Sequence, residues 1–249
     1  MRARRRRAAG KCVYSAPMEL PNPMLEGRLL RRYKRFLADV ELADGTVVTA
    51  HCPNTGSLLG CKQEGSRVIL RDSQKPERKL PLVFQTIEVE GTLVNVDTSL
   101  PNAVVFEAAQ AGEIPELDGY DAFRREVKYG VNSRIDVLLE QDSGARCYVE
   151  VKSTTLVRGR TALFPDAVTA RGLKHLGELA GVVREGQRAV QFFFVSRADA
   201  EEFRPAEDID PQYAAGLREA AAAGVEVLAY TSRVAPSSIR LDRRIPVRL

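Results

Sequence analysis

The segment RIDVLLEQDSGARCYVEVKST (134–154) contains two strand-like stretches joined by a short polar turn. The turn DSG (142–144) has glycine where a left-handed backbone is needed, which is typical of a three-residue β-hairpin connection. Pairing the residues that flank this turn places Asp136 opposite Glu150. Because alternate strand residues share a face, Glu150 and Lys152 are expected on the same polar face as Asp136, with an apolar face behind them.

Two carboxylates and an amine on one face suit a hard divalent cation, since Mg²⁺ is typically held by one or two carboxylates together with waters and substrate phosphate. We expect Asp136 and Glu150 to ligate Mg²⁺ or Mn²⁺, with the Val151 carbonyl as a further ligand. Lys152 would orient a water molecule or stabilise the charge that develops at a phosphate. The competing interpretation is a plain salt bridge between Glu150 and Lys152 along the strand.

The surrounding pattern predicts a mixed α/β sandwich, because helices and apolar strands alternate around the hairpin. A long loop at 156–165 is expected before the second helix, with Asp166 as its N-cap. The expected elements are a helix at 101–111, strands at 125–130, 134–141 and 146–154, a helix at 167–185, a strand at 189–196, a helix at 210–224 and a strand at 225–232.

Polar residues on the 167–185 helix recur at the spacing of a single helical face. Arg171, His175 and Glu178 stand at positions i, i+4 and i+7 and therefore lie on one side. They are candidates to support the carboxylate site. An exposed ladder of ion pairs is the alternative.

The N-terminal part predicts a five-stranded OB-type β-barrel, because strand patterns alternate with turn signals at 36–42, 46–52, 66–73, 79–90 and 92–98. Barrels of this type often bind nucleic acids. Basic residues cluster just before the first of these strands and again in a looser group near residue 78. We expect phosphate contacts from Arg32, Tyr33, Lys34, Arg35, Asn54, Thr55, Arg78 and Lys79. The alternatives are a solvated basic face and, at 51–56, a simple tight turn.

The 249-residue composition is that of a globular protein, with 44% hydrophobic and 28% charged residues and a mean hydropathy of −0.22. No apolar run approaches the length of a membrane span, so no membrane partner is expected. No pair among the four cysteines has the spacing of a zinc knuckle, and we expect free thiols and a cytoplasmic location. Residues 1–17 carry six basic residues and no acid. They are predicted to be a disordered basic arm, or to precede a true start at Met18.

Taken together, these segments resemble the sugar fermentation stimulation protein A family. The resemblance implies an OB-fold domain at 18–97 and a PD-(D/E)xK nuclease-like domain at 98–249. It also implies that Glu107 is the acid often found on the first helix of such nucleases. The matching stretches are RYKRFLADVEL (32–42), HCPNTG (51–56), REVKYG (125–130), SRID (133–136), EVKS (150–153), FPDAVTARGLKHLGEL (164–179) and GVEVLAY (224–230).

The family resemblance implies sequence-non-specific DNA binding and a regulatory role in sugar (maltose) metabolism. We therefore expect a DNA-binding protein with a Mg²⁺- or Mn²⁺-dependent phosphodiesterase site. A DNA-binding regulator with an inactive nuclease-like fold is the alternative. Because OB barrels bind RNA as well as single-stranded DNA, RNA is a further candidate partner, and single-stranded DNA is as acceptable as duplex.

Overall fold

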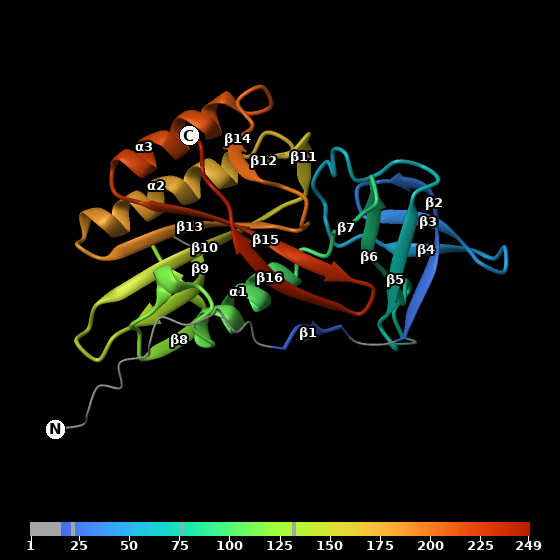
Figure 1. The fold of residues 1–249 in the computed structure, drawn as a ribbon, viewed down its shortest axis with the longest axis horizontal. Helices are drawn as coiled ribbons and strands as arrows, with labels where there is room; N and C mark the ends of the chain where they lie inside the picture. The colour runs from blue at the N-terminus through green and yellow to red at the C-terminus, as the bar shows by residue number, and fades with distance from the viewer. Residues whose placement is uncertain (1–15, 21–22, 76, 131–132) are drawn as a thin grey trace.

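The computed structural model describes residues 16–20, 23–75, 77–130 and 133–249. The expectation for residues 1–17 therefore falls almost entirely outside the described residues. Two lobes lie side by side in Figure 1, a β-barrel formed by the blue-to-green strands and a larger α/β lobe formed by the rest of the chain.

The barrel closes through five strands, which confirms the expected architecture. Strands β2 to β6 form it, and β7 extends it beyond β6, in the order β4-β3-β2-β5-β6-β7 with an added β4–β6 pairing. The strands are β2 (Met24–Tyr33), β3 (Leu37–Leu42), β4 (Val47–His51), β5 (Arg67–Asp72), β6 (Leu82–Val89) and β7 (Thr92–Asn95).

The sequence patterns missed β2, the first barrel strand. Leu29 is the only fully buried residue of this strand, so its charged, exposed side chains hide the alternation that identifies a strand. Gly27 lets β2 approach β3, because a Cβ atom there would lie 2.5 Å from the carbonyl oxygen of Glu41. The basic cluster read from the sequence is therefore the end of a barrel strand and the turn that follows it.

The larger lobe is built on a seven-stranded mixed sheet in the order β1-β16-β15-β13-β10-β9-β8. Its three central strands, β10, β13 and β15, are parallel to one another. The strands are β1 (Met18–Glu19), β8 (Ala122–Tyr129), β9 (Ser133–Glu140), β10 (Arg146–Thr154), β13 (Arg188–Val195), β15 (Glu226–Ala235) and β16 (Ser238–Arg244). Residues 18–19 thus pair with β16 in this sheet and do not lie in the barrel.

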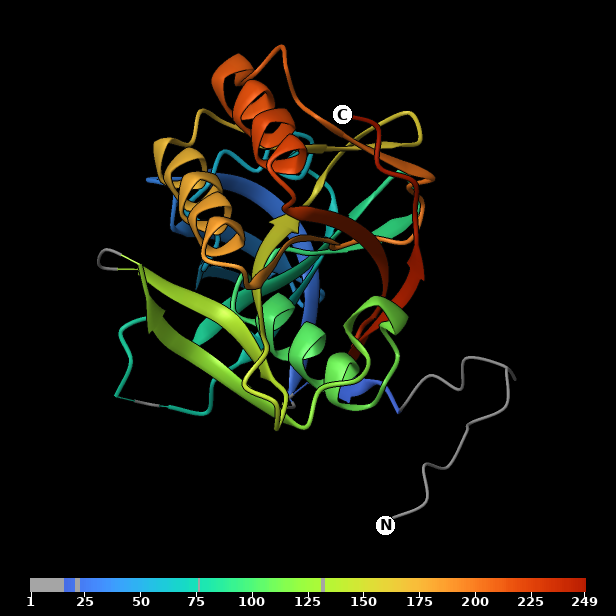
Figure 2. The ribbon, with the colours of Figure 1, turned by 90° about the vertical axis from the view of Figure 1, so that its left-hand side faces the viewer.

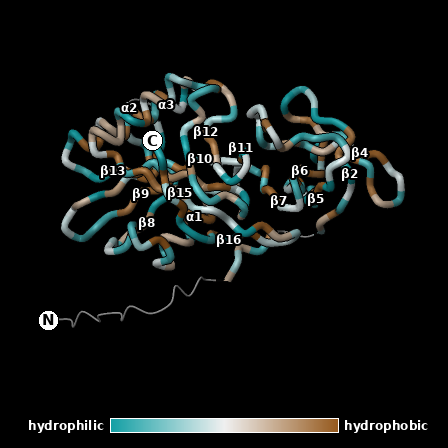
Figure 3. Tube along the Cα trace, turned by 45° about the horizontal axis from the view of Figure 1, so that its top comes forward, coloured by the Kyte–Doolittle hydropathy of each residue, from teal (hydrophilic) through white to brown (hydrophobic). Residues whose placement is uncertain are grey.

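Helices cover both faces of this sheet, as Figure 2 shows: α1 (Leu100–Gln110) on one face, and α2 (Ala170–Arg184) and α3 (Pro211–Ala222) on the other. The strand β13 shows why. Phe192 and Phe194 pack with α1, whereas Phe193 packs under α2 and α3. A strand buried on both faces must be apolar throughout, which explains the continuous apolar run in the sequence. In Figure 3 these central strands carry strongly hydrophobic segments.

Two local expectations were wrong. The predicted loop at 156–165 contains a hairpin of β11 (Leu156–Arg158) and β12 (Thr161–Phe164), which pairs with β14 (Glu202–Pro205). The second helix begins at Ala170, because Thr169 caps it by accepting a hydrogen bond from Gly172 N. Asp166 instead faces the barrel, where its carbonyl oxygen accepts a 2.6 Å bond from Ser57 Oγ.

Within the described ranges, no helix is both long and apolar enough to cross a membrane.

One buried carboxylate links the starts of α2 and α3. Asp210 is 4% exposed, and its two oxygens accept bonds from Tyr213 N at 3.0 Å and Thr169 N at 2.8 Å. Asp210→Ala should therefore lower the free energy of unfolding by about 2–3 kcal/mol in a urea titration, since both a cap and a second charged hydrogen bond are lost. Asp208→Ala, which removes only an exposed ion pair with Arg158, should cost about 1 kcal/mol or less. Equal losses in the two variants would contradict this role of Asp210.

Candidate active site

The hairpin at the centre of the site has the expected register near its turn. Gln141 N donates to Ala145 O at 2.9 Å, and the ladder continues to the Val149–Val137 pair. Beyond that pair β9 leaves β10. Asp136 therefore does not pair directly with Glu150, and its Oδ2 instead accepts a 2.7 Å bond from Val151 N at the freed edge of β10.

The ladder between β8 and β9 is interrupted next to the point where β9 leaves β10. Glu126 has a positive φ of 54°, and the β8–β9 register passes from Arg125–Val137 to Val127–Ile135 without pairing Glu126 and Asp136. Ile135 packs under α2, away from the face of Val137, so the expected single apolar face of β9 is broken.

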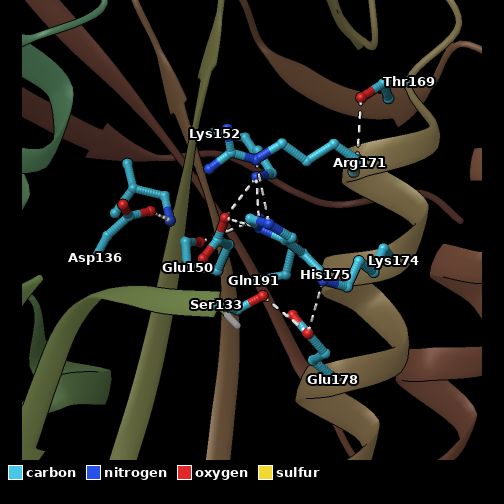
Figure 4. Close-up of polar contacts among 12 residues, drawn as sticks. Ser133, Asp136, Glu150, Lys152, Thr169, Arg171, Lys174, His175, Glu178 and Gln191 are labelled. Carbon is cyan, nitrogen blue, oxygen red and sulfur yellow. Dashed lines mark hydrogen bonds and ion pairs between the residues drawn. The ribbon is translucent and has the colours of Figure 1, made fainter. Parts of the chain in front are cut away.

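Glu150 lies at the centre of a buried polar cluster on the α2 side of the sheet. Its side chain is 3% exposed, and Oε1 accepts a 2.6 Å bond from Lys152 Nζ and a close contact from His175 Nδ1. Figure 4 shows Lys152 and His175 converging on this one carboxylate from β10 and from α2. The structure thus brings Glu150, Lys152 and His175 together, as the sequence pattern predicts.

Arg171 contacts His175 on the same face of α2. Its Nε donates to His175 Nε2 at 3.4 Å. A guanidinium can only donate, so Nε2 accepts in this contact. The other ring nitrogen, Nδ1, contacts Glu150 Oε1 and lies 3.4 Å from Lys152 Nζ. Glu178, the third residue of this helical face, bonds instead to Ser133 Oγ at 2.8 Å and so attaches α2 to the start of β9.

The two carboxylates have opposite electrostatic environments. Burial and then the nearby charge of Glu150 raise the pKa of Asp136 to about 7. Burial also acts to raise the pKa of Glu150, but the hydrogen bond from His175 and the charge of Lys152 outweigh it and lower that pKa. Glu150 is therefore an anion at neutral pH, whereas Asp136 titrates close to neutrality.

The donor set fits a hard divalent cation that keeps part of its water shell. Glu150 Oε2 is buried and has no hydrogen-bond partner among the described residues. No three acidic, histidine or cysteine side chains converge as a complete cation cage in the described part of the chain. A cation beside Asp136 and Glu150 would therefore need backbone oxygen, water or phosphate as its other ligands, which is the usual situation for Mg²⁺. Whether the Val151 carbonyl is one of these ligands stays a prediction.

The structure does not bring Glu107 to this cluster. Glu107 is exposed on α1, beside Glu113 and β16. Asn102, five residues earlier, points to the site instead, with its Nδ2 donating to Asp136 Oδ1 at 2.7 Å. Five residues of helix rotate a side chain by about 140°, so the two positions cannot share a face.

Gln191 is a second residue that the sequence analysis missed. It pairs with Glu150 across β10 and β13, and its Nε2 donates to Glu150 O at 3.1 Å. The signal was present, since Gln191 is the one polar side chain within the apolar run AVQFFFV (189–195). A buried amide in such a strand requires partners, and here it fixes the backbone beneath Glu150.

Of the expected DNA contacts, Arg32 and Tyr33 are engaged within the barrel. Arg32 donates to the carbonyl oxygens of Arg35, Asn54 and Gly56 at 2.6, 2.8 and 2.9 Å. The Tyr33 hydroxyl donates to Asp39 at 3.2 Å. Arg32 therefore organises the 54–56 turn, and a phosphate contact from its guanidinium would have to replace these bonds.

Arg35, Asn54 and Thr55 meet the active-site lobe directly. They line a cleft of about 390 Å³ whose other wall includes Lys152. Asn54 Oδ1 accepts a 2.8 Å bond from Gly56 N, so the expected tight turn is present as well. Lys34 is exposed in the turn after β2, and Arg78 and Lys79 are exposed in the loop between β5 and β6, outside this cleft.

The raised pKa of Asp136 predicts a pH-dependent stability when metal is removed by a chelator. A carboxyl whose pKa rises from 3.8 to about 7 on folding stabilises the folded state below about pH 4, and this stability is lost as the pH rises through about 7. Asp136→Asn stays neutral, and Asn102 can turn its amide to keep a bond to it. The melting temperature of the variant relative to the wild type should therefore increase between about pH 5 and pH 8.

Asp142→Asn, in the exposed hairpin turn, is the control and should show no such trend. A constant difference between Asp136→Asn and wild type across this pH range would mean that Asp136 is an ordinary ionised carboxylate.

Comparison with known proteins agrees with the architecture and the expected family. A family model described as the sugar fermentation stimulation protein RE domain matches residues 99–238, and one described as the SfsA N-terminal OB domain matches residues 30–96. The structure of Pyrococcus furiosus SfsA in complex with Ca²⁺ has a TM-score of 0.84 and 28% identity, covering 94% of this chain and all of that one.

Curated relatives are more similar in sequence. The sugar fermentation stimulation protein homolog of Pelobacter propionicus is 57% identical over 230 residues, which is 92% of this chain and 99% of that protein. The homolog of Maricaulis maris is 55% identical over 233 residues, with coverage of 93% and 99%. The two family models together cover most of the chain, and the relatives and the structural match each cover more than nine-tenths of it. The chain belongs to the sugar fermentation stimulation protein family.

Proposed function

We propose that this protein binds DNA without sequence specificity and hydrolyses phosphodiester bonds with a divalent cation held by Asp136 and Glu150. The observation that carries the proposal is the position of Lys152. Its ammonium bonds to Glu150, and the same residue lines the cleft that opens towards the barrel. A phosphate in that cleft would therefore lie beside the carboxylate pair.

Asp136 and Glu150 are the residues that would hold Mg²⁺ or Mn²⁺, and the Ca²⁺ complex of the Pyrococcus furiosus relative supports a preference for hard cations. When bound, such a cation polarises a phosphoryl oxygen and lowers the pKa of water. Lys152 orients the attacking water or stabilises negative charge on the phosphate. His175, held by Arg171, keeps the Glu150 carboxylate in position through Nδ1.

On the barrel side, Lys34 and Arg35 supply positive charge near the cleft, and Thr55 and backbone amides supply neutral donors. These groups recognise phosphate and carry no base-specific information. We expect DNA as the partner, with the OB barrel and the nuclease-like lobe acting as two domains that meet near residue 97.

A non-catalytic regulator of sugar metabolism is the second candidate, and one observation favours it. Glu150 Oε1 is already bonded to Lys152 and in contact with His175, so this oxygen has partners in the absence of any cation. The two candidates differ in whether a cation binds and whether DNA is cleaved.

Cation binding should raise the melting temperature of the wild-type protein, because it relieves the repulsion between Asp136 and Glu150 and binds only the folded state. Melting is measured with Mn²⁺, Mg²⁺ or Ca²⁺ against a chelator. Asp136→Asn should lose most of the increment. Glu107→Gln is the matched control on α1 and should keep it.

Lys152→Ala should retain the cation-dependent stabilisation yet lose cleavage of labelled DNA, because its role is towards water and phosphate. If wild-type protein melts identically with and without the cations and leaves DNA intact, the regulator without catalysis is the correct description.

The basic residues in the turn that follows β2 should contribute to the salt dependence of DNA affinity. Each phosphate contact contributes roughly −0.7 to −0.9 to the slope of log K against log salt. Lys34→Ala combined with Arg35→Ala should flatten this slope by about 1 to 2 and weaken binding to all sequences alike. Fluorescence anisotropy over a salt series measures both quantities.

The paired substitution Arg78→Ala with Lys79→Ala removes the same charge from the loop between β5 and β6. A larger loss of DNA affinity in this second variant would show that DNA binds at the loop between β5 and β6 and not at the cleft.

A further inference from the structure

The cleft between the barrel and the α/β lobe is the feature that restricts which substrate can reach the candidate active site. Its barrel wall is formed by Arg35 and residues 54–56, and its opposite wall by residues 151–155 and 163–169. Its volume is about 390 Å³, which elsewhere suits one small ligand. That volume is of the order of one nucleotide, so the second strand of a duplex would have to lie outside these walls.

Hydrogen bonds between the two lobes keep the cleft narrow. Ser57 Oγ donates to Asp166 O at 2.6 Å, and Thr98 Oγ1 donates to Pro53 O at 3.4 Å. Beyond the cleft, Asn95 N donates to Ser196 O at 3.0 Å. Opening the cleft to admit a duplex would break these bonds between the lobes.

The lining favours an unpaired strand chemically as well. Arg35 Nε donates to Thr55 O at 2.8 Å, and no hydrogen bond or ion pair of its terminal nitrogens is found within the described ranges, so these nitrogens can bind a phosphate. Phe36 follows Arg35 in the same turn and is 44% exposed, just outside the residues that line the cleft. Val168, in the opposite wall, is 75% exposed. Aromatic and apolar side chains beside a cationic group are typical of proteins that stack the bases of single strands.

Asp166 adds a negative charge to the cleft, opposite to that of Arg35. Its Oδ1 would lie 3.4 Å from a Cβ atom at Gly56, so this carboxylate faces the barrel wall of the cleft. Asp166 therefore repels phosphate from its own part of the cleft, whatever the strand state of the DNA. A single strand can place its backbone at Arg35 and Lys152 and its bases towards the apolar groups.

We propose that the cleft is a binding site for unpaired DNA, either a single strand or the frayed end of a duplex. Arg35 binds a phosphate, Phe36 stacks on a base, and Val168 packs against the strand as it passes towards Lys152. This inference rests on the proposed function and names the strand state of its substrate.

The test is equilibrium binding to fluorescein-labelled DNA of about 16 nucleotides, the upper end of OB-fold site sizes, with a chelator present to prevent cleavage. The same sequence is used as a single strand, as a duplex and as RNA. The wild-type protein should bind the single DNA strand at least tenfold more tightly than the duplex. Phe36→Ala and Val168→Glu should each weaken binding to the single strand by about tenfold and leave the weaker binding to the duplex almost unchanged.

Val47 supplies the matched controls, because it is 57% exposed at the end of β4 remote from the cleft. Val47→Ala and Val47→Glu should not alter affinity for the single strand. Equal or tighter binding of the duplex, tighter binding of RNA, or equal losses on both DNA forms would overturn the assignment of the cleft while leaving DNA binding intact. Failure to bind either form of DNA would overturn the proposed function as well.

Discussion

The separation of β9 from β10 after the Val149–Val137 pair is the constraint on which the site depends. Had the ladder continued beyond this pair, the backbone groups of β9 and β10 would have bonded to each other. Instead Val151 N bonds to the side chain of Asp136, and that carboxylate is held beside Glu150 in a partly buried position. Burial and mutual repulsion then make this position costly for two anions, and a divalent cation would relieve both.

The rest of the α/β lobe keeps this arrangement rigid. Gln191 fixes the backbone of Glu150 from β13, while α2 presents His175 to its carboxylate and Asn102 of α1 holds Asp136 from the other side of the sheet. Asp210 in turn caps α3 and bonds to the residue that caps α2. The barrel contributes the second wall of the cleft beside the site, because its 54–56 turn faces the part of the cleft that is lined by Lys152.

Local patterns predicted most of the elements and the cluster of Glu150, Lys152 and His175, because strand alternation and helical spacing determine which residues share a face. These patterns failed where tertiary packing determines which residues are buried and which face of a helix meets the site. The strand β2 carries too many exposed charges to show alternation, and Glu107 was assigned by analogy, although the face of α1 that meets Asp136 bears Asn102. The end of the β9–β10 ladder after Val149–Val137, and the positive φ of Glu126 on the neighbouring strand, leave no sign in the residue types.

The central claim is that a cation binds between Asp136 and Glu150, and anomalous X-ray scattering from crystals grown with Mn²⁺ tests it most directly. The account predicts an anomalous peak within coordination distance of Asp136 and of Glu150 Oε2, the oxygen that has no hydrogen-bond partner among the described residues. A cation of this kind binds carboxylate oxygens directly. Crystals that show Mn²⁺ only at other positions, with Glu150 still bonded solely to Lys152 and His175, would contradict the claim.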